Sequence, residues 1–88
     1  MSEHKGQLHR DTPATYRIRL QGKLDKNWSE YLDGMTIADA QATDWTPVTI
    51  LTGQLVDQAA LIGVLNSVYD LGFPLISVEC LEFGTNHT

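Results

Sequence analysis

The clearest pattern in the chain is a strict alternation of apolar and polar residues over residues 16–24. The apolar members fall on one face: Tyr16, Ile18, Leu20 and Leu24. The polar members fall on the other: Arg17, Arg19, Gln21 and Lys23. Because successive side chains of a strand point to opposite faces, this alternation predicts a half-buried first strand. Its three cations, Arg17, Arg19 and Lys23, are called the basic stripe.

A short helix is predicted after this strand. Asp25 can cap it, and Trp28, Tyr31 and Leu32 recur at spacings of three and four residues. Because Tyr31 and Leu32 continue the stripe of Trp28, we expect Trp28 in the core. Asp33-Gly34 would end the helix.

A longer helix is predicted later in the chain, after Asp57 as its cap. Gly72 is placed to stop this helix, and Pro74 prevents its continuation. The residues of its apolar stripe are Leu61, Val64, Leu65, Val68 and Leu71. Their spacing of three and four is typical of a helix that covers a core with one face.

Three further strands are predicted, over residues 35–40, 48–53 and 75–81. The first two would form a hairpin joined by a loop that contains Trp45. The third and fourth strands of the chain carry apolar residues on both faces. In residues 75–81, Leu75 and Leu81 are expected on one side, opposite Ile76, Val78 and Cys80.

The order of these elements is strand, short helix, strand, strand, long helix, strand. Helices with one-sided apolar stripes need a sheet to cover, which predicts an α+β fold: a two-layer sandwich with a four-stranded antiparallel sheet. The connections fit the ferredoxin-like β-α-β-β-α-β plait. Residues 25–34 are barely long enough for a helix that crosses a sheet, so a β-meander with one main helix is the alternative.

One helical layer covers one face of a sheet, so the other face should expose apolar groups beside the basic stripe. A homodimer would close this face, and acidic residues could pair with the basic stripe across the two-fold axis. The interface candidates are Val48, Ile50, Leu75 and Leu81.

Charge is distributed unevenly along the chain. The net charge is −5, which argues against general affinity for nucleic acid. All six Lys and Arg residues lie within residues 1–26, so an anion would have to bind the first strand or the N-terminal arm. The basic stripe is therefore a candidate site for a small anionic ligand or a partner carboxylate. Trp45 could line a ligand cleft or an interface.

Few residues support catalysis. Each of the three histidines, His4, His9 and His87, lies in a predicted arm or tail, so no core imidazole is available as a base. Cys80, the one cysteine, is expected to be a buried inert thiol. We expect no enzyme activity, no cofactor and no metal site.

Two resemblances bear on these expectations. The blocks WSEYLDGMTI, TILTG, DQAAL and DLGFPL within residues 16–81 resemble a family of small uncharacterised bacterial proteins. That resemblance implies the domain limits and no catalytic residue. Residues 19–23 also look faintly like the first strand of acylphosphatases, which share the size and the plait. The phosphate-binding glycine turn of those enzymes is not matched, and Asp25 would repel a phosphate.

The expected organisation is an arm over residues 1–13, one domain over residues 14–83 and a tail over residues 84–88. No apolar run is long enough to span a bilayer, and the first residues lack the apolar core of a signal peptide, so a cytoplasmic protein is expected. The leading hypothesis is a non-catalytic, self-associating interaction module that works through the open sheet face. The alternatives are a sensor of small anionic ligands, a module for a protein partner and an acylphosphatase-like hydrolase.

Overall fold

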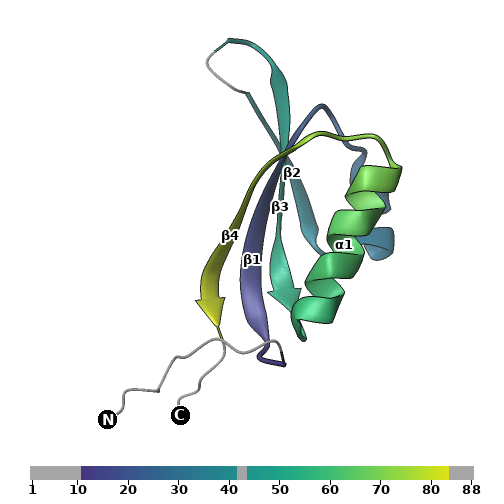
Figure 1. Ribbon diagram of the computed structural model, residues 1–88. Coiled ribbons are helices and arrows are strands. Elements are labelled where there is room, and N and C mark those ends of the chain that lie inside the picture. The colour runs from purple at the N-terminus through teal and green to yellow at the C-terminus, as the bar shows by residue number, and fades with distance from the viewer. Residues whose placement is uncertain (1–10, 42–43, 84–88) are drawn as a thin grey trace.

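The computed structural model describes residues 11–41 and 44–83 of the chain. The predicted arm and tail lie almost entirely outside these residues. Within them, the elements follow the order β1 (Ala14–Gln21), η1 (Lys26–Trp28), η2 (Glu30–Leu32), β2 (Thr36–Gln41), β3 (Pro47–Leu55), α1 (Gln58–Asp70) and β4 (Leu75–Phe83). The strands form one antiparallel sheet in the order β2-β3-β1-β4, with α1 and the two short 3-10 helices η1 and η2 on one side of it (Figure 1). The predicted α+β class is therefore confirmed.

The predicted alternation of β1 is also confirmed. Along this strand, buried and half-buried residues alternate up to Gln21. Ile18 and Leu20 are fully buried, and Ile18 lies opposite the equally buried Leu51 of β3. Each such side chain contributes about 1.5–3 kcal/mol by leaving water. The core thus lies between the central strand pair β1–β3 and the layer that contains α1.

The first crossover differs from the expected short helix. It consists of two 3-10 turns, η1 and η2, in place of an α-helix. Asp25 does cap the first turn, because its Oδ1 accepts a hydrogen bond from the N–H of Asn27 at 2.9 Å. The expected core position of Trp28 is wrong: Trp28 is 39% exposed and Tyr31 is 55% exposed. Leu32 alone of this predicted stripe is buried.

Distance explains the missing helix. β1 and β2 both run antiparallel to β3, so the connection between them must return along the sheet. Ten residues of α-helix would reach about 15 Å, because an α-helix rises about 1.5 Å per residue and a 3-10 helix about 2.0 Å. A strand of the length of β2 spans about 20 Å. The tighter turns and the extended residues beside them cover that distance.

The second crossover contains the predicted long helix. The carboxylate of Asp57 accepts a hydrogen bond from the N–H of Ala60 at 2.9 Å and so caps α1. At the other end, Gly72 has a φ of 87°. The N–H of Gly72 donates to Tyr69 O and the N–H of Phe73 donates to Val68 O, which is a Schellman stop. Among the described residues, no helix is long and apolar enough to span a membrane.

Candidate functional site

The sheet face away from α1 carries the second half of the β1 alternation. Arg17 and Arg19 lie on this face, and it is not covered by the described elements (Figure 1). Strand pairing places Ser77 opposite Arg19 and Glu79 opposite Arg17. This surface is called the open face below. Its two arginines sit in different surroundings.

Arg17 is already paired within the chain. Its Nε donates to Oε1 of Glu79 at 2.8 Å, between side chains that are 35% and 42% exposed. The hydrogen bond from Arg17 lowers the pKa of Glu79, and the positive charges of Arg17 and Arg19 act in the same direction. Arg17 is therefore engaged by an acid of the same chain.

Arg19 borders an apolar hollow in the open face. The hollow has a volume of about 340 Å³, and its lining consists of Arg19, Ala40, Gln41, Val48, Ile50 and Ile76. It is called the Arg19 hollow below. Two of the expected interface candidates, Val48 and Ile50, lie here. Arg19 forms no ion pair with any of the residues that the structure describes.

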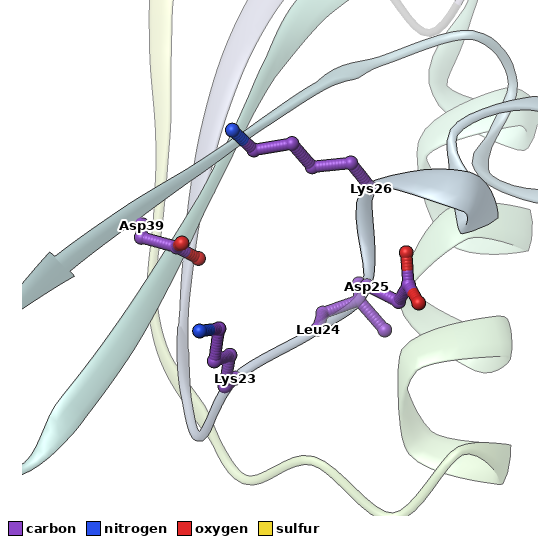
Figure 2. Close-up of a pocket in the computed structure, with 5 residues that line it drawn as sticks. All are labelled: Lys23, Leu24, Asp25, Lys26 and Asp39. Carbon is purple, nitrogen blue, oxygen red and sulfur yellow. The ribbon is translucent and has the colours of Figure 1, made fainter.

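The expected place of Lys23 on the basic stripe is wrong. β1 ends at Gln21, and Gly22 with a φ of 114° turns the chain before Lys23. Lys23 instead borders a second hollow of about 470 Å³ with Leu24, Lys26 and Asp39, and Figure 2 shows Asp25 with its carboxylate turned away from it. The alternation stops here because the chain turns at Gly22, in a backbone conformation that glycine adopts readily.

The connection at this second hollow is also where an acylphosphatase would bind phosphate. Its backbone N–H groups are used inside the domain: Gly22 donates to Pro47 O at 2.8 Å, and Leu24 donates to Oγ1 of Thr49 at 3.0 Å. Oγ1 of Thr49 in turn donates to Gly22 O at 2.8 Å. These contacts fix the end of β1 against β3.

Trp45 lies in the β2–β3 connection and is 79% exposed, with a φ of 72°. The neighbouring turn is held by a hydrogen bond from the N–H of Thr46 to Oδ1 of Asp44. The hydrogen bonds from Thr46 lower the pKa of Asp44. Trp45 is not among the residues that line the Arg19 hollow. The structure therefore does not bring Trp45 together with the two arginines.

β4, the outermost strand next to β1, carries the interface candidates Leu75 and Leu81 together with three residues that sequence reasoning did not include among the site residues: Ile76, Val78 and Cys80. Its large apolar residues are exposed on both faces: Leu75 and Ile76 at 51%, Leu81 at 45% and Val78 at 38%. On the helix side, Phe83 at the end of β4 packs against the core, whereas Leu75 and Val78 stay exposed. These four residues and Cys80 are called the β4 surface. The two-sided apolar pattern of residues 75–81 indicated this surface in part, because it led to Leu75 and Leu81 as interface candidates.

Two expectations for β4 are corrected. Cys80 is exposed, not buried. Leu75 does not share the open face with Val48 and Ile50, because it lines a groove of about 310 Å³ on the helix side with Leu65 and Tyr69. The cause is two β-bulges: the pairing with β1 skips Ile76 and Leu81, and each bulge breaks the alternation of faces.

No group of three or more metal-ligating side chains occurs within residues 11–41 and 44–83.

The features above define a class of protein: a small α+β domain whose antiparallel sheet has one face covered by a helix and one apolar edge strand. The chain belongs to the family described as a domain of unknown function, DUF8691, whose family model matches residues 15–79. No curated protein and no solved structure matches the chain. The family membership agrees with the resemblance to an uncharacterised family.

Proposed function

We propose that this chain is a self-associating interaction module whose working surface is the β4 surface. The observation that carries the proposal is that β4, an outermost strand of nine residues, exposes large apolar side chains on both faces. Exposed apolar edge strands template pairing with another chain, and soluble proteins usually blunt or cover them. A second copy paired along this edge would bring its own apolar side chains beside those of β4 on both faces.

We place the interface at β4, the strand that borders the open face, and not at the centre of the open face. The open face is polar where Arg17 and Glu79 form their ion pair. The helix side of β4 adds apolar area in the groove of Leu65, Tyr69 and Leu75, where Tyr69 is 81% exposed. We read the fold as a ferredoxin-like plait in which the first helix is reduced to two 3-10 turns. That reduction leaves α1 as the one long helix among the described residues, and it does not bury Leu75, Val78 or Leu81 of β4.

Sedimentation equilibrium on the full chain tests the proposal. We expect a dimer at tens of micromolar for the unaltered chain and a monomer for Val78→Lys, because a charge on an edge strand opposes edge pairing. Ala38→Lys places the same charge on an exposed residue of β2, the other edge, and should leave the dimer intact. Circular dichroism checks that both variants fold. A monomer at several hundred micromolar for the unaltered chain, or equal dissociation of both variants, would contradict the proposal.

A second candidate function is a sensor for small anionic ligands at the Arg19 hollow. The observation that favours it is an arginine without an acidic partner among the described residues, beside Val48, Ile50 and Ile76. A guanidinium beside an apolar surface suits a carboxylate with an apolar tail.

Calorimetric titration with a series of fatty carboxylates from acetate to octanoate tests this candidate. Affinity should rise with tail length, because each buried methylene contributes about 0.8 kcal/mol. Arg19→Gln should remove the binding, whereas Lys26→Gln, which removes a cation elsewhere, should keep it. No heat of binding along the whole series, or equal loss in both variants, would reject it.

A further inference from the structure

We infer that the β4 strands of two copies pair antiparallel edge to edge, with Val78 facing Val78 of the second copy across a two-fold axis. The inference rests on the proposed self-association and names the register of its contact. Three observations carry it: a free strand edge, the position of the two β-bulges and the charges along the strand.

The free edge supplies the hydrogen bonds. β4 pairs with β1 along one edge, and no strand of the described residues pairs with its other edge. The backbone N–H and C=O groups that point away from β1 are thus open to a further strand. An antiparallel partner satisfies them in the way that β1 satisfies the inner edge. A second copy of β4 brings the same groups and the same length.

Symmetry restricts where the two-fold axis can pass. Residues directly opposite one another in an antiparallel pair have side chains on the same sheet face. Because faces alternate along a strand, an axis perpendicular to the sheet must pass beside one residue that faces its own copy. The β-bulges skip Ile76 and Leu81, so the regular part of β4 is residues 77–80. Only Val78 and Glu79 have a regular neighbour on each side.

Charge decides between these two centres. An axis beside Glu79 would place two carboxylates directly opposite each other, which destabilises a strand pair. An axis beside Val78 places apolar groups together on the helix side, where Val78 is 38% exposed. The same register places Ser77 opposite Glu79 of the second copy on the open face.

Pairing of the two β4 strands would also bring together apolar residues on the helix side of both copies. Ile62 and Tyr69 are 56% and 81% exposed and lie seven residues apart on α1, two turns along one side of the helix. Tyr69 borders the groove that also contains Leu75 of β4. In the paired arrangement the two bare β4 surfaces meet between the two helices, so apolar groups from both copies leave water together.

Disulfide trapping tests the register. The variant is Val78→Cys in a Cys80→Ser background, oxidised in the full chain under native conditions and scored on non-reducing gels. The two residues at position 78 face each other about 4.5–5.5 Å apart at Cα, within disulfide range, so we expect near-complete cross-linking. Glu79→Cys in the same background is the matched control. Its two copies would be about 8 Å apart, beyond that range, and should cross-link poorly.

The unaltered chain gives a second readout, because the two copies of Cys80 would lie about 14 Å apart and should stay reduced. Efficient cross-linking at position 79 or 80, with little at position 78, would overturn the register and leave self-association standing. A dimer by sedimentation that cross-links at none of these positions would also overturn the edge pairing. A monomer by sedimentation would overturn the proposed function with it.

Discussion

The two edges of the sheet differ in length and chemistry. β2 has six residues, and its exposed positions carry threonine, alanine, aspartate and glutamine. β4 has nine residues, and four large apolar side chains on it are exposed. Short, polar edges discourage pairing with other chains, and long apolar edges invite it. The comparison shows one edge that is protected and one that is suited to a partner.

The acidic residues of the two edges make the same contrast. Asp39 of β2 is exposed and borders the second hollow, which Lys23 also lines. Glu79 of β4 is tied to Arg17 of the neighbouring strand, so its charge is compensated within the sheet. A compensated charge opposes an incoming strand less than a free one does. β2 thus carries an acid without an ion-pair partner among the described residues, and β4 carries an acid that is ion-paired with β1.

The largest expected effect separates the core from the β4 surface. Leu51→Ala should lower the free energy of unfolding by about 2–5 kcal/mol, because the side chain is fully buried in the core on the central strand β3. Ile76→Ala, on the exposed β4 surface, should cost less than about 1 kcal/mol when both are measured in a Val78→Lys background by urea unfolding. Because Val78→Lys should keep the chain monomeric, dimer formation does not add to the measured free energy of unfolding. Equal losses would show that β4 is part of the core.

A smaller loss is expected where the end of β1 is fixed against β3. Thr49 is fully buried, and its hydroxyl bonds to Gly22 O and to the N–H of Leu24. Thr49→Val should cost about 1–3 kcal/mol in unfolding free energy, because it leaves both backbone groups without their partner. Thr52→Val on the same strand is the control and should change stability little. Dimerisation should be unaffected by either variant; a dimer weakened by Thr49→Val would show that the contact between β3 and the end of β1 takes part in assembly.

A substitution at the start of α1, the helix that leads to β4, should lower stability less. Asp57→Ala removes the cap of α1 and should cost about 1 kcal/mol, measured by thermal unfolding. Asp57→Asn should cost much less, because asparagine caps as well as aspartate. A similar loss in the two variants would indicate that the charge of Asp57, and not its hydrogen bond to Ala60, stabilises the helix.

The smallest effect is the pH dependence of the Arg17–Glu79 pair. The hydrogen bond from Arg17 lowers the pKa of Glu79 below its ordinary value of 4.5, so the native state favours the ionised carboxylate. The stabilisation is present above pH 4.5 and is lost as the pH falls through the lowered pKa. Glu79→Gln should therefore reduce stability at neutral pH and have no effect in acid. In an Arg17→Gln background the same substitution should show no such pH dependence.

Local patterns predicted much of the fold. The alternation of residues 16–20, the cap at Asp57 and the stop at Gly72 are local signals, and each is found in the structure. The predicted first helix failed because its length had to match a distance across the sheet, which no local pattern encodes. Trp28 and Tyr31 have helical spacing, yet the turns that carry them present both to solvent.

The candidate site was predictable in part. The open face with Arg19, Val48 and Ile50 followed from alternation, and their joint hollow is found there. Lys23 was misplaced because β1 ends at Gln21 and the chain turns at Gly22. Leu75 was misplaced because the β-bulge at Ile76 breaks the alternation of faces. The sequence showed that residues 75–81 are apolar on both sides. It could not show that this strand lies at the edge, because strand order depends on long-range pairing.

Hydrogen exchange at the two edges tests the central claim most directly. In the full chain at high concentration, the β4 amides that do not bond to β1 should exchange slowly, and they should become fast on dilution below the dissociation constant. The outward amides of β2 should exchange fast at both concentrations. Outward β4 amides that exchange equally fast at every concentration, or protection that builds up on β2 instead, would contradict the account.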